Sequence, residues 1–332
     1  MKDSKLHLAD FTENQQNTEI PKYYGEALCE IARVDNNLVA LCADLAPPTE
    51  TDIFRDEFPD RYYMTGIAEA NMIGLASGMA KMGDIPFVHS FCVFLTRRAY
   101  DQVAMQVAYP RTNVKLIGFI PGITTLLGVS HQAIDDIALM RALPNMCVIE
   151  PSGPEQVESA VKAIYDYNGP VYMRLNRASS IVNKEEFKSL TIGKVDILKH
   201  GKDIVIFACG LMVHKASQAA IKLKSKGIEA TVVNVSTLKP MNDQTILDIA
   251  KECGCVITAE NHSIIGGLSD AISSFLVENN INILFKKIGL NDTFAEGAST
   301  DYLLKKYKMD IDDIYENSLN LMKIKGNGNG NI

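Results

Sequence analysis

The chain has 332 residues, of which 47% are hydrophobic and 22% charged, a balance typical of a soluble globular protein long enough for two domains. Its formal net charge of −7 and the lack of a basic stripe argue against a nucleic-acid partner. No apolar run reaches the roughly 18 residues that span a bilayer, and the polar N-terminal stretch lacks the apolar segment of a secretory signal, so we expect neither a membrane span nor export.

Apolar runs of strand length alternate with helical patterns through the first half of the chain. The expected strands cover residues 37–43, 85–89, 113–119, 146–150 and 169–175. The expected helices cover residues 21–33, a segment that carries Glu69 and stops near Gly83, residues 130–143 with Ser130 as N-cap, and residues 154–167. Residues 52–59 are expected to form a polar loop or short helix, and residues 91–108 to begin as a loop and become a helix.

Around residues 179–194 the charge rises and the apolar runs stop, which indicates a boundary. Beyond it, the expected strands cover residues 203–209, 229–235, 255–259 and 281–288. The expected helices cover residues 214–226, 243–252, 268–278, 299–307 and 310–324. We therefore expect a flexible arm (1–18), a first domain (19–180), a linker (181–194), a second domain (195–325) and a disordered Gly-Asn tail (326–332).

This alternation predicts an α/β protein with two consecutive domains, each a mostly parallel sheet flanked by helices. In such sheets, ligands bind beyond the carboxyl ends of the strands. Asp44, the 89–97 loop, the 119–131 loop and Arg177 all follow expected strands, so we expect them to meet at one edge of the first sheet.

The stretch 64–80 alternates small residues with Ile, Leu and Met, which is typical of a helix packed against other backbone on most sides. Its one ionisable group, Glu69, falls in the first turn. There a carboxylate can simply complement the helix dipole. Alternatively, Glu69 is buried in a cleft and bonds to the ring nitrogen of a ligand.

Four segments of the first unit resemble, in order, the pyrimidine-binding domain of transketolases: FPDRYYMTGIAEANMIGLASGMA, PFVHSFCVFLTRRAYDQV, GVSHQAIDDIALMRALPNM and GPVYMRLNRAS. Two segments of the second unit, TAENHSIIGGLSDAI and DTFAEGASTDYLLKKY, are similar to the C-terminal domain of the same family. The resemblance implies a thiamine-diphosphate-binding fold for the first unit and a transketolase C-terminal-like domain for the second.

The sequence contains no Gly-Asp-Gly, the motif with which the N-terminal domain of full-length transketolases holds the cofactor diphosphate through Mg2+. The chain therefore looks like the C-terminal subunit of a split transketolase. This resemblance implies a separate N-terminal subunit that carries Mg2+, an α2β2 heterotetramer, and a sugar or sugar-phosphate substrate.

The resemblance also implies roles for individual residues. Glu69 matches the carboxyl that bonds to the pyrimidine nitrogen of thiamine diphosphate, a role suited to a dry pocket, where carboxyl pKa values rise. Phe91 and Phe94 fall where the family stacks aromatic rings against the pyrimidine, although two Phe three residues apart are also typical of an ordinary core. The Arg97-Arg98 pair occupies the region of a third aromatic residue.

On the substrate side, His131 matches a histidine that faces the reacting ketose, and the alternative is a hydrogen-bonded histidine at a helix start. Asp44 matches an acidic position near the thiazolium, although it could also be a turn former. Arg177, and possibly Arg174, lie where the family binds the phosphate of the acceptor, and a surface salt bridge is the alternative.

The implied activity is transfer of a two-carbon ketol unit from a ketose to an aldose. A deoxyxylulose-phosphate synthase-like enzyme, the β subunit of a 2-oxoacid dehydrogenase, and a regulatory homologue that has lost the chemistry stay open as alternatives. The seven cysteines are scattered without a ligand cluster, so we expect no metal site in this chain and buried thiols in a reducing cytoplasm.

Overall fold

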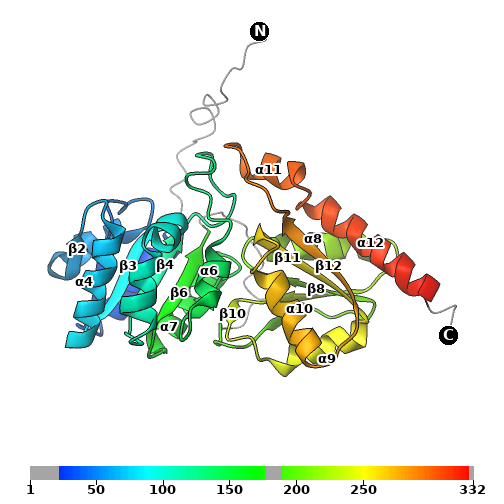
Figure 1. Cartoon of the computed structure of the whole chain (residues 1–332), viewed down its shortest axis with the longest axis horizontal. Helices are drawn as coiled ribbons and strands as arrows, with labels where there is room; N and C mark the ends of the chain where they lie inside the picture. Colours follow the sequence, from blue (N-terminus) through cyan, green and yellow to red (C-terminus); the bar gives the residue numbers. More distant parts are fainter. Residues whose placement is uncertain (1–21, 177–188, 329–332) are drawn as a thin grey trace, which may run out of the picture.

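The computed structural model describes residues 22–176 and 189–328. The strands of the first sheet are β1 (Leu38–Cys42), β2 (Tyr62–Met64), β3 (Ile85–Phe91), β4 (Lys115–Phe119), β5 (Cys147–Ile149), β6 (Val171–Leu175) and β10 (Thr237–Lys239). They lie in the order β10-β5-β6-β4-β3-β1-β2, and all neighbours are parallel except β10, which runs antiparallel to β5 (Figure 1). Strands β1, β3, β4, β5 and β6 are buried almost throughout because helices cover both faces of the sheet.

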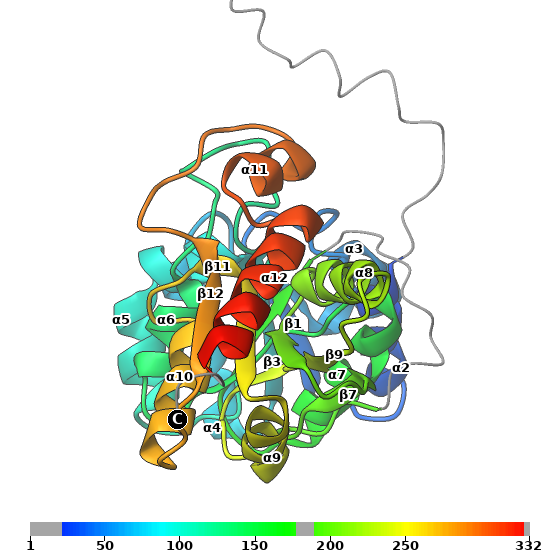
Figure 2. The ribbon, with the colours of Figure 1, turned by 90° about the vertical axis from the view of Figure 1, so that its right-hand side faces the viewer.

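The helical segments of the first domain are α2 (Tyr23–Ala32), α3 (Thr51–Glu57), η2 (Pro59–Arg61), α4 (Glu69–Met82), η3 (Phe94–Arg98), α5 (Tyr100–Gln102), η4 (Val103–Ala108), α6 (Asp136–Ala142) and α7 (Pro154–Asp166). Helices α2 and α7 pack together on one face of the sheet, whereas α4, α5 and α6 cover the other (Figure 2).

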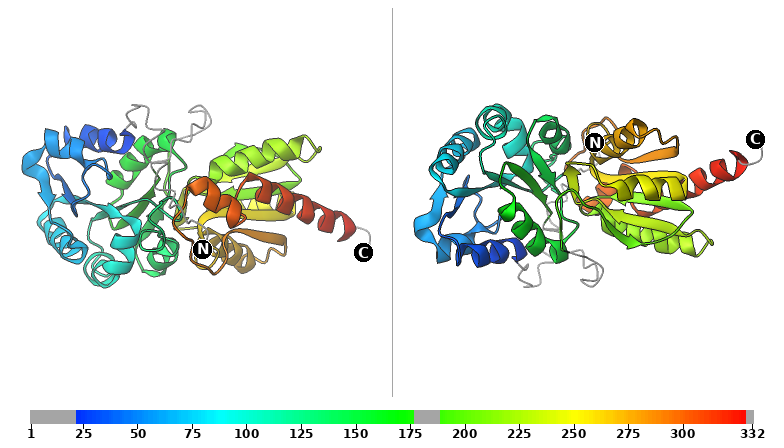
Figure 3. Two further views of the ribbon diagram at one scale, coloured as in Figure 1. Left: turned by 90° about the horizontal axis from the view of Figure 1, so that it is seen from above. Right: turned by 90° about the horizontal axis from the view of Figure 1, so that it is seen from below.

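The second sheet contains β7 (Asp196–Lys199), β8 (Ile204–Ala208), β9 (Ala230–Asn234), β11 (Cys255–Ser263) and β12 (Leu284–Leu290) in the order β12-β11-β8-β9-β7. Its helices are α8 (Met212–Lys224), α9 (Gln244–Cys253), α10 (Leu268–Glu278), α11 (Thr300–Lys306) and α12 (Ile311–Gly328). The two domains lie side by side, each with helices on both faces of its sheet (Figure 3). The predicted fold class, two consecutive α/β domains with mostly parallel sheets, is confirmed.

Two sequence-based expectations about segment boundaries differ from the structure. Strand β10 comes from the second half of the chain but pairs with β5 of the first sheet, with Thr237 opposite Ile149, so one strand crosses the boundary between the domains. The tail expected from residue 326 begins inside α12, which runs to Gly328. The expected arm (1–18) and most of the expected linker lie outside the described residues.

The helix expected over residues 130–143 is too long at its start. Helix α6 begins at Asp136, and its N-cap position is Asp135 rather than Ser130. Residues before it cannot be helical because Ala133 forms an antiparallel bridge with Gly122, and the Gly122 N–H donates to the Ala133 carbonyl (2.9 Å). The preceding segment is therefore part of a loop that is held at both ends.

A neutral histidine is built into the core beside the first sheet. His89 of β3 is fully buried. Its Nδ1 lies 2.9 Å from the Leu41 carbonyl oxygen and its Nε2 lies 2.6 Å from the Tyr24 hydroxyl oxygen. Both contacts are satisfied when Nδ1 carries the proton and the tyrosine hydroxyl donates to Nε2. Burial lowers the pKa of His89 to about 4.

His89 should therefore make the fold sensitive to acid. Between the usual histidine pKa near 6.5 and the folded value of about 4, the unfolded chain binds a proton that the folded chain does not, so stability falls as the pH falls. From pH 7 to pH 5 we expect a loss of about 2 kcal/mol in the free energy of unfolding, measured in urea. His89→Gln should flatten this dependence, whereas the exposed His200→Gln should keep it; an unchanged slope in His89→Gln would contradict the prediction.

Candidate active site

The candidate site lies at the carboxyl-end edge of the first sheet, where β1, β3 and β4 end next to one another. Parallel strands bring the loops that follow them to one edge. Phe91 closes β3, and His131 lies on the loop that leaves β4. Glu69 reaches the same region from the first turn of α4.

Glu69 is a buried carboxylate with a cationic partner. Its side chain is 1% exposed, and its two oxygens accept hydrogen bonds from Arg98 Nη1 at 2.9 and 3.0 Å. A carboxylate that only complements a helix dipole needs no such burial, and burying a charge is costly unless it is paired. The surroundings expected to be apolar therefore contain a guanidinium that balances the carboxylate.

Phe91, Phe94 and His131 form an aromatic cluster. The two phenylalanine rings are stacked, with centroids 5.9 Å apart and an interplanar angle of 29°. The His131 ring stands edge-on to both, with centroids 6.1 Å from Phe91 and 5.3 Å from Phe94. The structure thus brings together three residues that the sequence places in two separate loops.

Arg98 connects this cluster with Glu69, and the sequence analysis did not assign it a role. Its guanidinium carbon lies 4.2 Å from the centroid of the Phe94 ring, while its Nη1 donates to Glu69. Arg98 ends the π-helix η3 that Phe94 begins, and single π-turns are frequent at functional sites. The Arg97-Arg98 pair at the position of an expected aromatic residue was the sequence signal for this contact.

His131 is suited to proton transfer near neutral pH. Burial and the nearby Arg98 lower the pKa of its imidazole, so the neutral ring predominates at pH 7. Ser130 Oγ lies 2.9 Å from His131 Nδ1. Nearby, Arg97 donates from Nε to both carboxylate oxygens of Asp135 at 2.9 Å, which ties η3 to the start of α6.

Asp44 follows β1 at the same edge of the sheet but is exposed. Its φ of +57° is a left-handed conformation that asparagine and aspartate tolerate better than most residues. Its backbone N–H donates to Met64 Sδ (3.1 Å). Asp44 therefore lies beside β2 and has a backbone conformation that agrees with a turn former, one of the two roles considered for it from the sequence.

The expectation that Arg174 binds substrate phosphate is not supported, because its guanidinium is fully buried and paired with two carboxylates. Nε donates to Asp136 (2.8 Å), Nη1 to Glu150 (2.9 Å), and Nη2 to Asp136 (3.0 Å). Because the guanidinium has no exposed surface and is held by two carboxylates, it is not accessible to a substrate phosphate, and Arg174 is part of the core. Arg177 lies outside the described residues.

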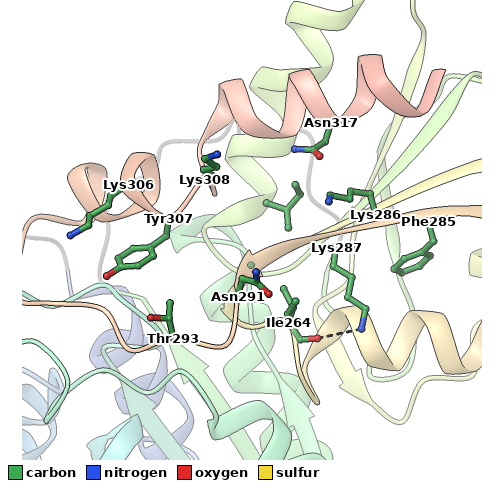
Figure 4. A pocket seen from close by; sticks show the side chains of 12 residues that line it. Ile264, Phe285, Lys286, Lys287, Asn291, Thr293, Lys306, Tyr307, Lys308 and Asn317 are labelled. Carbon is green, nitrogen blue, oxygen red and sulfur yellow. Dashed lines mark hydrogen bonds between the residues drawn. The ribbon is translucent and has the colours of Figure 1, made fainter. Parts of the chain in front are cut away.

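A concave region lies in the second domain, between β12 and α12, with a volume of about 750 Å³ (Figure 4). Four lysines line it: Lys286, Lys287, Lys306 and Lys308. Lys287 is paired with Asp270 and Lys306 with Glu296, so half of this positive charge is neutralised. This pocket shares no residue with the Glu69 cluster, which consists of Glu69, Phe91, Phe94, Arg98 and His131. We take the Glu69 cluster as the candidate site because it brings together residues that the sequence marked as functional.

The Glu69 cluster fits the pyrimidine end of thiamine diphosphate. A buried carboxylate offers a partner for a ring nitrogen, and stacked aromatic side chains offer faces for a planar heterocycle. Within residues 22–176 and 189–328, no group of three or more His, Cys, Asp and Glu could hold a metal ion. None of the helices described there is long and apolar enough to cross a membrane.

Comparison with protein families gives two matches. Residues 16–181 match the transketolase pyrimidine binding domain, and residues 193–314 match the transketolase C-terminal domain.

Individual relatives agree with these matches. The chain is 42% identical to the 6-deoxy-6-sulfo-D-fructose transketolase subunit SqwH of Clostridium sp. (strain MSTE9), over 88% of this chain and 90% of the relative. It is 32% identical to a 1-deoxy-D-xylulose-5-phosphate synthase of Halothermothrix orenii, over 96% of this chain but 50% of that enzyme. Among solved structures, a split-gene transketolase described as an inactive β4 tetramer superposes with a TM-score of 0.84 at 38% identity, covering 92% of this chain and 98% of that one.

Proposed function

Because this chain belongs to the transketolase family, we propose that it is the C-terminal subunit of a split, thiamine-diphosphate-dependent transketolase. In this proposal it transfers a two-carbon ketol unit from a ketose to an aldose, and it is active only with a separate N-terminal subunit. The observation that carries the proposal is the cluster of Glu69, Arg98, Phe91, Phe94 and His131 at one edge of the first sheet.

Bound thiamine diphosphate supplies carbanion chemistry at its thiazolium ring. Glu69 bonds to the pyrimidine nitrogen and stabilises the tautomer that can accept a proton, while Arg98 balances the carboxylate charge. Phe91 and Phe94 orient the ring by stacking. His131, neutral at pH 7, exchanges protons with the hydroxyl groups of the sugar. Asp44 is the acidic group that we assign to the thiazolium side.

The Mg2+ and the diphosphate are held by the N-terminal subunit in this proposal, and the complex is an α2β2 heterotetramer. A relative that aligns over 88% of this chain and 90% of its own length is named as a transketolase subunit, and a solved structural neighbour is a split-gene transketolase described as an inactive β4 tetramer. Both support a chain that needs a partner for activity.

The proposed donor is a ketose with an anionic group at the end remote from its carbonyl, such as a sugar phosphate or sulfonate. The name of the Clostridium relative specifies a sulfonated ketose. Arg177 is the residue we assign to such an anion. The seven cysteines are all buried and unpaired, which supports a reducing cytoplasmic location.

The proposal is tested by co-expressing the chain with the product of the neighbouring gene and measuring thiamine diphosphate binding and donor cleavage. We expect turnover from the complex and none from either subunit alone. Full cofactor-dependent turnover by this chain alone would refute the split arrangement. If no combination binds the cofactor, the regulatory-homologue alternative takes its place.

A second candidate activity is the one carried by the deoxyxylulose-phosphate synthase relatives, because the chain aligns over 96% of its length with half of such an enzyme. The β subunit of a 2-oxoacid dehydrogenase belongs to the same group of alternatives. Both use pyruvate-like substrates and release carbon dioxide. Carbon dioxide release from pyruvate by the complex, without ketol transfer from sugars, would favour this group.

A further inference from the structure

The loop that carries His131 is anchored in the other domain. We define the His131 loop as residues 120–134, between β4 and α6. Its apolar side chains Ile123 and Ile134 are buried, and both belong to the core cluster of the second domain, which also includes Leu290 and Ala295. In Figure 1 and Figure 2 the loop lies beside the segment that leads from β12 to α11. The loop therefore belongs to the first domain in sequence, but its apolar side chains pack in the core of the second domain.

Asn261 of β11 binds the loop on both sides of Gly122. Its Oδ1 accepts a hydrogen bond from the Ile123 N–H (3.0 Å), and its Nδ2 donates to the Pro121 carbonyl (3.0 Å). The Asn261 side chain is buried, with the residue only 1% exposed. Its own backbone carbonyl accepts from Arg174 Nη2 (3.2 Å), so the buried Arg174 network of the first domain in turn holds Asn261.

Gly122 makes this close approach possible. It has a φ of +58°, and a Cβ at this position would lie 2.2 Å from the Asn261 carbonyl oxygen. No side chain fits between the loop and β11. Because the Gly122 N–H also donates to the Ala133 carbonyl (2.9 Å), both ends of the loop are fixed where Asn261 binds.

A second contact holds the loop next to His131. Gln132 Nε2 donates to the Glu296 carbonyl (3.0 Å). Gly128 and Gly297 meet closely, since a Cβ on Gly297 would lie 2.5 Å from the Leu126 carbonyl oxygen and one on Gly128 would lie 3.1 Å from the Gly297 nitrogen. The loop therefore contacts the second domain near both of its ends, through Asn261 at residues 121–123 and through Glu296 at Gln132.

We propose that Asn261 is a positioning residue, through which the second domain fixes the His131 loop and so places the imidazole against Phe91 and Phe94. This inference rests on the proposed function, in which His131 faces the ketose. It gives the second domain, which contributes none of the five residues of the Glu69 cluster, a role in the reaction. Asn261 itself does not touch the reacting atoms.

The test uses Asn261→Ala in the full chain, alone and in complex with the N-terminal subunit. In the complex, we expect kcat to fall about 10²-fold, the effect of displacing a reacting group by about 1 Å, with thiamine diphosphate affinity changed by less than about threefold. In the chain alone, His131 is followed by NMR titration, with its signal assigned by its loss in His131→Gln. Its pKa, lowered in the wild type by burial and Arg98, should return toward the ordinary histidine value.

The matched control is Asn279→Ala. Asn279 is an exposed asparagine of the same domain, and its Nδ2 donates to the Phe275 carbonyl within its own helix end (2.8 Å). This variant should keep the wild-type kcat and His131 titration. Should Asn261→Ala not yield folded protein, Asn261→Asp carries the test, because it keeps the acceptor for Ile123 and replaces the donor to Pro121 with an oxygen that repels the Pro121 carbonyl.

The inference is overturned if the folded variant keeps the wild-type kcat and His131 titration, or if it loses cofactor affinity and kcat in parallel. Failure of the proposed function is distinguishable from either result. In that case the wild-type complex itself shows no ketol transfer, while the His131 titration in the chain alone still reports whether Asn261 positions the loop.

Discussion

Glu69→Gln is expected to lower kcat for ketol transfer by the assembled complex about 10²–10⁴-fold, the range for losing a positioned acid–base group. The side chain is buried and nearly isosteric with glutamine, and it accepts hydrogen bonds from Arg98, which lies over the Phe94 ring of the aromatic cluster. The substitution therefore removes the carboxyl chemistry while leaving the shape of the site in place. Steady-state kinetics with the donor ketose, alongside thiamine diphosphate binding, measures the effect.

The alternative interpretation, that Glu69 only complements the dipole of α4, predicts a different result. In that case Glu69→Gln would cost about 0.3–1 kcal/mol of stability and leave turnover intact. Glu26→Gln is the matched control, because Glu26 is an exposed glutamate in the first turn of α2. It should leave kcat unchanged, and wild-type kcat in Glu69→Gln would remove Glu69 from the proposed site.

Arg174→Met is expected to lower the free energy of unfolding by about 3–5 kcal/mol, the largest stability effect among the substitutions considered. It leaves Asp136 and Glu150, both buried, without their counter-charge. Asp136 would keep the hydrogen bond from the Tyr172 hydroxyl (2.6 Å) but lose both bonds from the guanidinium. Burial acts to lower the pKa of Arg174, but the two carboxylates raise it above its usual value, so the guanidinium stays charged.

Urea unfolding at pH 7 measures this loss, and Lys162→Met is the control. Lys162 forms an exposed pair with Asp166 within α7 (3.1 Å), so its removal should change stability by less than about 0.5 kcal/mol. If Arg174 bound the phosphate of a substrate, as the family resemblance first implied, Arg174→Met would instead keep its stability and raise KM.

The long buried strands were readable from the sequence because each is a nearly continuous apolar run. The elements that were missed are short or irregular. Strands β2 and β7 are partly exposed, and β10 has three residues and pairs with a strand far away in the sequence. The π-helices η3 and η4 lie in the segment 91–108, which was expected to begin as a loop and become a helix, because local propensity does not record where packing forces an extra residue into a turn.

For the candidate site, the motifs marked Glu69, Phe91, Phe94 and His131, and the tertiary structure brings these side chains into one cluster. Their functional roles stay predictions. Arg98 and Asn261 were not assigned roles, because their importance comes from partners 29 and 138 residues away in the sequence. The opposite error occurred for Arg174. Its place near a strand end could be read from the sequence, but its pairing with the buried carboxylates of Asp136 and Glu150 could not.

The α/β architecture, the two-domain division and the family could be predicted from hydrophobic periodicity and local motifs, because these are properties of neighbouring residues. The pairing of charges, the place of β10 in the first sheet and the packing of the His131 loop against the second domain became known from the folded structure alone. These features depend on contacts between distant segments, where burial makes an unpaired charge or an unsatisfied backbone group costly. That cost selects partners by their position in space, which the order of residues along the chain does not specify.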